Sequence, residues 1–150
     1  LPIYKALPGK VLNCYSHRSG GGKYMVILQC KKTVHTDEGK QRQAALLAFS
    51  AFPELKHVIL VDEDVDIFDT DDVLWAMNTR FQGDRDIVTI PGVRCHPLDP
   101  SSDPDYDPSI TDRGISAKTI FDCTVPFHLK DRFRRAAFLE VDPAKWLGEK

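Results

Sequence analysis

Uninterrupted apolar runs alternate along the chain with segments whose apolar residues recur at helical spacing. Residues 23–30 (KYMVILQC) and 56–61 (KHVILV) each contain a continuous apolar run with β-branched members, and 86–90 (DIVTI) is a shorter run of the same kind. Such runs are typical of strands buried on both faces. Between them, 36–52 and 69–81 carry apolar residues at helical spacing and begin with residues that cap helices. The order strand, helix, strand, helix, strand predicts a βαβαβ unit, with a largely parallel sheet covered by helices.

The remaining segments extend this pattern towards both ends. Residues 118–125 (KTIFDCTV) have the pattern of a fourth strand, 128–138 that of a further helix, and 144–150 that of a last short helix after a proline. Residues 1–23 are expected to be irregular, because prolines and a run of three glycines interrupt them. Residues 91–116 form a long loop rich in Pro, Asp and Ser, and loops of this length inside a compact domain are commonly functional.

Length, charge and cysteine content restrict the classes of function. A chain of 150 residues fits one domain, residues 1–150, and its net charge of −2 gives no support to a nucleic-acid or membrane-surface partner. No apolar run approaches the roughly 18 residues of a membrane span. The four cysteines are far apart, without a CxxC pair, so reduced thiols in a cytoplasmic protein fit better than a disulfide framework or a zinc–thiolate site. The first residues, LPIYKALPG, lack a starting Met and suggest a piece of a longer chain.

Carboxylates dominate one short segment, since seven of the eleven residues from Asp62 to Asp72 are Asp or Glu. In a parallel sheet, ligands bind outside the carboxyl ends of the strands, which is where this segment is expected. Asp62 and Asp64 form a DxD pair that could hold Mg²⁺ or Mn²⁺, as in metal-dependent phosphatases and nucleotide-sugar transferases. The alternative is structural: the first acids turn the chain out of the sheet, and Asp69, Asp71 and Asp72 cap the following helix.

Other motifs of catalysis are missing from the chain. It has no GxGxxG or GxxxxGK[ST] phosphate loop, no HExxH or HxH metal motif and no Gx[SC]xG nucleophile elbow. Of the five histidines, His96 is singled out because it lies in the long loop beside Cys95, near the expected ligand edge. The residues therefore predict a fold and a ligand-binding edge, but no complete catalytic set.

Several segments, taken in order, resemble the C-terminal domain of the UbiD family of decarboxylases. They are GGKYMVILQCKK, HVILVDEDVDIFDTDDVLWAMNTRFQGDRDIV, VRCHPLDPSS, AKTIFDCTVPF and RAAFLEVDPAKW. The second is the most specific, since it combines an apolar strand, an acidic turn with D-V-D and the pattern V-L-W-A-x-x-T-R. The resemblance implies an α/β fold of three layers, α/β/α, around a largely parallel mixed sheet. It also makes the acidic segment a strand-to-helix turn of the family instead of a metal cage.

The resemblance also implies an activity. Enzymes of this family reversibly decarboxylate aromatic, heteroaromatic or α,β-unsaturated acids with prenylated FMN, whose azomethine ylide forms a covalent adduct with the substrate. The flavin, a divalent metal (Mn or Mg), potassium and the catalytic Glu-Arg-Glu set belong to the preceding domain. No catalytic, cofactor-binding or metal-binding residue is therefore assigned within residues 1–150. No cofactor is expected in this chain, which is expected to be inactive alone.

Two residues are assigned to the substrate by the same resemblance. The segment VRCHPLDP matches the family loop that places side chains against the substrate, which points to His96 and Leu98. Relatives acting on cinnamate-like acids carry an apolar aromatic residue at the position of His96, whereas an imidazole can hydrogen-bond a phenol, a ring heteroatom or a second carboxylate. We therefore expect a hydroxybenzoate, gallate or furan acid as substrate.

Family membership further implies two partners for the chain: its own N-terminal flavin domain and further copies in a homo-oligomer. Two other interpretations stay open at this point. One is a phosphatase-like or glycosyltransferase-like domain that uses Asp62 and Asp64, and the other is a non-catalytic module that uses the fold only for assembly.

Overall fold

Five strands form one mixed sheet in the computed structural model, which describes residues 2–136, 141–142 and 145. The sheet order is β1-β2-β3-β5-β4, in which β2, β3 and β5 run parallel while β1 and β4 pair antiparallel at the two edges. The strands span Val11–Ser16 (β1), Met25–Cys30 (β2), His57–Asp62 (β3), Ile87–Arg94 (β4) and Ile115–Cys123 (β5). The predicted α/β fold with a mixed sheet is confirmed.

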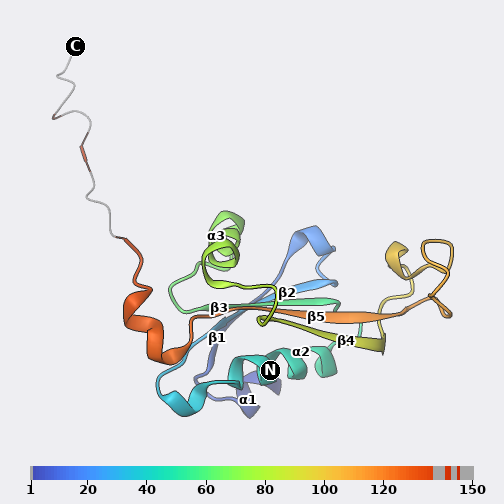
Figure 1. Ribbon diagram of the computed structural model, residues 1–150, viewed down its shortest axis with the longest axis horizontal. Coiled ribbons are helices and arrows are strands. Elements are labelled where there is room, and N and C mark those ends of the chain that lie inside the picture. Colours follow the sequence, from blue (N-terminus) through green and yellow to red (C-terminus); the bar gives the residue numbers. More distant parts are fainter. Residues whose placement is uncertain (1, 137–140, 143–144, 146–150) are drawn as a thin grey trace.

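Helices lie on both faces of this sheet and produce the three predicted layers (Figure 1). α1 (Pro2–Ala6) and α2 (Lys40–Ala51) cover one face, and α3 (Thr70–Arg80) covers the other. α2 begins later than the predicted 36–52, because the chain first forms a 3₁₀ turn, η2 (His35–Asp37), and then passes through Gly39 at a φ of 87°. A backbone conformation of this kind strongly favours glycine, so Gly39 fixes where the helix starts.

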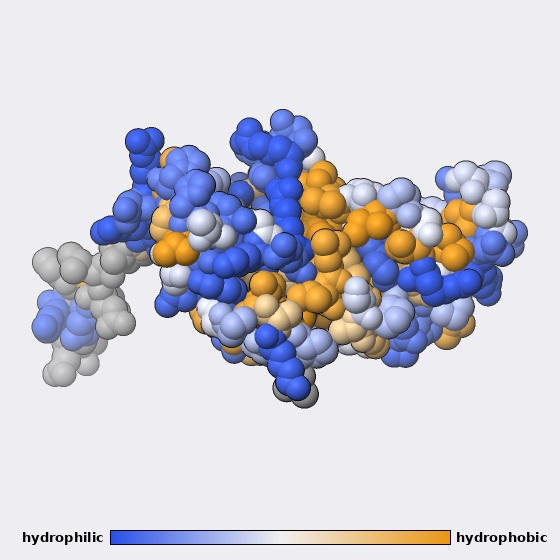
Figure 2. All heavy atoms as spheres, turned by 90° about the horizontal axis from the view of Figure 1, so that it is seen from below, coloured by the Kyte–Doolittle hydropathy of each residue, from blue (hydrophilic) through white to orange (hydrophobic). Residues whose placement is uncertain are grey.

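Strand residues alternate between the two faces, and each face has its own apolar cluster. On the α1–α2 side, Leu28 and Leu60 pack among buried side chains that include three alanines of α2. On the α3 side, Ile27 and Val61 pack with Val73 of the helix. Figure 2, which views the molecule from the α1–α2 side, shows further apolar side chains at the surface among charged ones. The sheet is therefore buried on both faces, as its continuous apolar runs predicted.

The two edge strands differ from the prediction. Residues 86–90 were expected as the third parallel strand, but β4 lies antiparallel at the edge because β5 is inserted between it and β3. The register of β4 shifts between Ile90 and Val93, around Pro91, and a proline inside a strand is tolerated at an edge. The expectation of an irregular N-terminal segment 1–23 was also wrong, since it contains α1 and β1.

The structure describes only part of the segment that follows β5. The predicted helix 128–138 is wrong in its described part: the chain forms a 3₁₀ segment, η4 (Phe127–Arg132), with three residues per turn, and residues 133–136 are not helical. Residues 137–138 lie outside the described residues. Most of the last predicted helix, 144–150, lies outside the described residues. The long loop runs from Cys95 to Gly114 and contains a further 3₁₀ turn, η3 (Pro100–Ser102); a last one, η1 (Arg18–Gly20), follows β1.

Candidate functional site

The acidic segment leaves β3 at the edge where the three parallel strands end. Arg80, in the last turn of α3, reaches this edge and lies between two of its carboxylates. Its Nη1 donates to Asp62 Oδ2 at 3.0 Å and to Asp64 Oδ1 at 2.7 Å, and its Nη2 donates to Asp64 Oδ2 at 2.7 Å. The Arg80 and Asp62 side chains are only 2% and 3% exposed. A guanidinium therefore occupies the position that the DxD interpretation gave to a metal.

This arrangement contradicts the metal-dependent alternative. The pKa of Asp62 is raised, mainly by its burial, although the backbone N–H of Val125 and the charge of Arg80 act against the rise. The pKa of Asp64 is lowered, chiefly by its hydrogen bonds to Arg80. Within the described residues, no group of three or more His, Cys, Asp or Glu side chains is placed to hold a metal ion. The DxD pair is an ion-pair site in this fold.

Two further acids of the segment, Asp69 and Asp72, have structural partners. Asp69 Oδ1 accepts from the backbone N–H of Asp71 and caps α3, as the structural alternative predicted. Asp72 Oδ2 accepts from the backbone N–H of Asp66 at 2.7 Å and also pairs with Arg135, whose guanidinium stacks on a tryptophan ring of α3. The strand-to-helix turn predicted for these residues is therefore what the structure contains.

Further ion pairs lie at the same edge, and two of them, Arg42–Asp122 and Lys32–Glu38, line a cavity of about 420 Å³. They join Arg42 to Asp122 at 2.7 Å, Lys32 to Glu38 at 3.2 Å and Lys130 to Glu63 at 2.8 Å. Lys32 also donates to the backbone oxygen of Val125 at 2.9 Å. Because each of these cations already faces a carboxylate, this edge offers a ligand little uncompensated charge, and we interpret it as structural.

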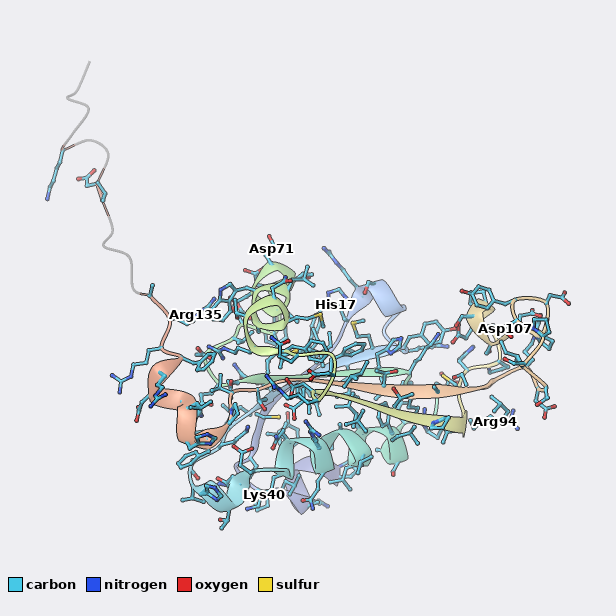
Figure 3. The ribbon with its side chains drawn as sticks, in the orientation of Figure 1. His17, Lys40, Asp71, Arg94, Asp107 and Arg135 are labelled. Carbon is cyan, nitrogen blue, oxygen red and sulfur yellow. The ribbon has the colours of Figure 1, made fainter. Side chains whose placement is uncertain are left out.

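The segment with His96 and Leu98 lies beyond the amino ends of the parallel strands, not near their carboxyl ends as expected. The cause is the direction of β4, which runs antiparallel to β5 and delivers the chain to the amino ends of the parallel strands. In Figure 3 the carboxyl ends and the amino ends of the parallel strands lie at opposite ends of the sheet. Arg135 lies beside the carboxyl ends, and Arg94 and Asp107 lie towards the amino ends.

The structure brings His96 and Leu98 together in one tight turn. His96 Nδ1 accepts from the backbone N–H of Leu98 at 3.1 Å, and the imidazole packs edge-on against Tyr24 with ring centroids 5.8 Å apart. The imidazole is buried, whereas the Leu98 side chain is 74% exposed. The turn thus presents an apolar side chain outwards and holds the imidazole behind it.

This loop is tied to the segment that precedes β3. Lys56 Nζ lies 2.7 Å from Asp99 Oδ2, and Ser101 donates to the same carboxylate. Burial of Asp99 acts to raise its pKa, but the hydrogen bonds from Lys56 and Ser101 outweigh it and hold the pKa below its usual value. The ion pair fixes the loop just beyond Leu98.

Sequence reasoning missed two charged residues beside His96. Glu54 Oε1 lies 3.7 Å from His96 Nε2, and Glu54 Oε2 lies 3.9 Å from Lys23 Nζ. The three residues come from separate connections, at positions 23, 54 and 96. No local pattern signals such a group, because only the packing of the three connections at one edge of the sheet brings it together.

With the fold and both edges described, comparison with known proteins identifies the family. Residues 1–123 match the family model of the 3-octaprenyl-4-hydroxybenzoate carboxy-lyase C-terminal domain, UbiD_C. The chain belongs to this family, as its resemblance predicted.

Among the described residues, every helix is too short or too polar to span a lipid bilayer.

Individual relatives extend the match beyond the family model. The chain is 61% identical over 145 residues to a gallate decarboxylase of Lactiplantibacillus plantarum. This match covers 96% of the chain and 29% of that protein. The apo structure of a 3,4-dihydroxybenzoic acid decarboxylase from Enterobacter cloacae is 61% identical, with a TM-score of 0.88, and the match covers 97% of this chain and 30% of that one. The UbiD-class enzyme HmfF from Pelotomaculum thermopropionicum, solved with FMN, is 30% identical with a TM-score of 0.80 over 97% of this chain and 31% of that one. The chain thus spans less than a third of the length of these relatives.

Proposed function

We propose that the chain is the C-terminal domain of a non-oxidative decarboxylase that acts on hydroxylated aromatic acids. The observation that carries this proposal is the 61% identity to a gallate decarboxylase across 96% of the chain. Support comes from the Enterobacter cloacae structure, which is named for 3,4-dihydroxybenzoic acid. Gallic acid and 3,4-dihydroxybenzoic acid are both benzoic acids with adjacent ring hydroxyls. Among the substrates expected from the sequence, the proposal therefore favours hydroxybenzoates and gallate over furan acids.

The proposed cofactor is prenylated FMN, together with a divalent metal (Mn or Mg) and K⁺, held by the longer protein. This part rests on family membership and on the FMN complex of HmfF. When bound, prenylated FMN supplies the ylide that carries the covalent chemistry of decarboxylation. The described residues of this chain do not fit the metal, because Arg80 lies between the two carboxylates that could have held it. We therefore assign the catalytic acid–base residues and the cofactor site to the preceding domain.

For this chain we propose a role in lining the substrate pocket, through the turn at His96 and Leu98. The exposed Leu98 side chain is suited to packing against an aromatic ring, and His96 Nε2 can donate a hydrogen bond to a ring hydroxyl. In the longer protein, His96→Phe should lower kcat/KM for hydroxybenzoates and improve it for cinnamate-like acids. An unchanged substrate profile would remove His96 from the proposal.

We also propose that the partners are the chain's own N-terminal flavin domain and further copies in a homo-oligomer, in the cytoplasm. The exposed apolar residues Leu98, Leu46 and Tyr4 support packing against such partners. The four cysteines, all free thiols, support a reducing compartment.

One absorbance experiment tests the central proposal. The 150-residue chain and the longer protein would each be co-expressed with a flavin prenyltransferase, purified, and examined by visible spectroscopy. We expect flavin absorbance and release of CO₂ from 3,4-dihydroxybenzoate with the longer protein only. A colourless and inactive longer protein would contradict the proposed function.

A further inference from the structure

The Glu54 carboxylate is an open hydrogen-bond acceptor beside the proposed substrate turn. Its two oxygens face His96 Nε2 at 3.7 Å and Lys23 Nζ at 3.9 Å, and both distances are longer than a hydrogen bond. In the described part of the chain, no group donates a hydrogen bond to this carboxylate, and its side chain is 39% exposed. The carboxylate therefore faces two donor groups while its capacity to accept hydrogen bonds stays unused.

The backbone under Glu54 is fixed more firmly than an ordinary surface turn. Three consecutive carbonyl oxygens accept hydrogen bonds from side chains: Lys118 donates to those of Pro53 (2.7 Å) and Leu55, and Cys95 Sγ donates to that of Glu54 (3.5 Å). The ammonium group of Lys118 is buried, which lowers its pKa, and it also lies 5.2 Å from the centroid of the Phe49 ring. A binding group on a backbone held in this way loses little freedom when it meets a ligand.

The hydrogen bond made by Nδ1 also determines what His96 can offer at its other nitrogen. Because Nδ1 accepts from the N–H of Leu98, the proton of the neutral ring sits on Nε2, the atom that faces Glu54. The corner thus pairs a donor, His96 Nε2–H, with an acceptor, the Glu54 carboxylate. Leu98 supplies an apolar surface two residues away.

We propose that Glu54 is a substrate-binding residue that accepts a hydrogen bond from a ring hydroxyl of a vicinal dihydroxy aromatic acid. The proposal deepens the proposed function and rests on it. One hydroxyl of such a ring donates to Glu54, while the oxygen of its neighbour accepts from His96 Nε2–H. The Lys23 ammonium group faces the other oxygen of the carboxylate, at 3.9 Å. A ring whose two hydroxyls are both methylated lacks the donor that Glu54 requires, so the corner selects free hydroxyls.

The test compares Glu54→Gln with the matched control Asp84→Asn in the longer, flavin-loaded protein. Asp84 is an exposed carboxylate in the turn after α3. Inhibition constants would be measured for catechol and for 1,2-dimethoxybenzene, alongside kcat/KM for 3,4-dihydroxybenzoate. Glutamine keeps a neutral acceptor, so the variant loses only the charge-assisted part of the hydrogen bond, which should weaken catechol binding about tenfold. We expect binding of 1,2-dimethoxybenzene, which has no hydroxyl to donate, to change less than about threefold in the same variant, and Asp84→Asn to change neither.

The possible outcomes separate this inference from the function beneath it. If the parent protein carries no flavin and releases no CO₂, the proposed function fails and the inference fails with it. If the parent is active and Glu54→Gln behaves like Asp84→Asn, or weakens both ligands equally, only the role of Glu54 is wrong. If Glu54→Gln does not fold, the parent alone decides, because equal affinity for catechol and 1,2-dimethoxybenzene would contradict a free-hydroxyl acceptor.

Discussion

At the scale of single residues, Arg80 determines how the acidic segment is interpreted. Seven carboxylates in eleven positions are compatible with a metal site or with a turn. The distinction depends on which cation lies among them, and Arg80 stands 16 and 18 positions away from its two partners. An arginine at the end of a helix carries no sign in the sequence that it will turn back towards the strand end.

Removing this cation should destabilise the fold strongly. In Arg80→Met, Asp62 would remain buried without its partner, and breaking a buried ion pair costs about 3–5 kcal/mol of the free energy of unfolding. The measurement is a urea unfolding curve monitored by circular dichroism. Arg85→Met is the control, because that side chain is 70% exposed and should change stability by less than about 0.5 kcal/mol. Equal midpoints for the two variants would contradict the structural role of Arg80.

A second carboxylate should make stability depend on pH. Hydrogen bonds to Asp37 from Lys10 first, and then from Lys40 and the backbone N–H of Thr33, hold its pKa far below the usual value. A carboxyl whose pKa is depressed in the folded state stabilises the fold above its unfolded pKa of about 3.9, and that stability is lost as the pH falls further.

Asp37→Asn should therefore be less stable than the parent at neutral pH, and the difference should shrink as the pH falls from about 4 to about 2. Urea midpoints at a series of pH values would measure it. Asp131→Asn serves as the control, since that carboxylate is 92% exposed. A parent–variant gap that stays constant down to the lowest pH would show that Asp37 does not titrate in this way.

At the scale of elements, local patterns predicted the interior strands and α3 well, and the edges poorly. β2, β3 and α3 lie within one or two residues of their predicted bounds, because buried strands and a capped helix leave strong local signals. β1 was not predicted, because an edge strand is only partly buried and lacks a continuous apolar run: four of its six residues are exposed. Pro91 is compatible with an edge strand, but the prediction ended the strand at residue 90 and placed Pro91 in the long loop, whereas β4 continues to Arg94.

The start of α3 depends on one side chain. Asp69→Ala removes the acceptor for the backbone N–H of Asp71 and should cost about 1 kcal/mol of stability. Asp69→Asn keeps an acceptor in the same place and should lie much closer to the parent protein. Thermal unfolding of the three proteins measures the effect. If alanine were tolerated as well as asparagine, the cap would not determine where the helix begins.

At the scale of the whole molecule, the two apolar clusters should unfold together. Ile27 and Leu28 are neighbours on β2, both almost fully buried, and they point to opposite faces of the sheet. Since one strand contributes to both clusters, neither cluster can open without disrupting the other. The 150-residue chain should therefore unfold in a single transition.

Ile27→Ala and Leu28→Ala test this expectation as a matched pair. Each should cost about 2–5 kcal/mol, and circular dichroism should give the same midpoint as the fluorescence of Trp75 on α3. A Trp146→Phe background removes the other tryptophan. Separate transitions for the two probes in either variant would mean that the layers on the two faces of the sheet unfold independently.

The sequence alone determined the α/β class, the buried strands and α3, because each depends on contiguous residues whose spacing records burial and capping. It also identified the family, through the resemblance of several motifs to those of known members. Tertiary structure alone decided the order of the strands and the antiparallel direction of β4, since strand pairing is a choice among distant segments. Because β4 is antiparallel, His96 and Leu98 lie beyond the amino ends of the parallel strands instead of the carboxyl ends, where they were expected. There the fold places Glu54 beside His96, a contact between residues 42 positions apart that no local spacing could encode.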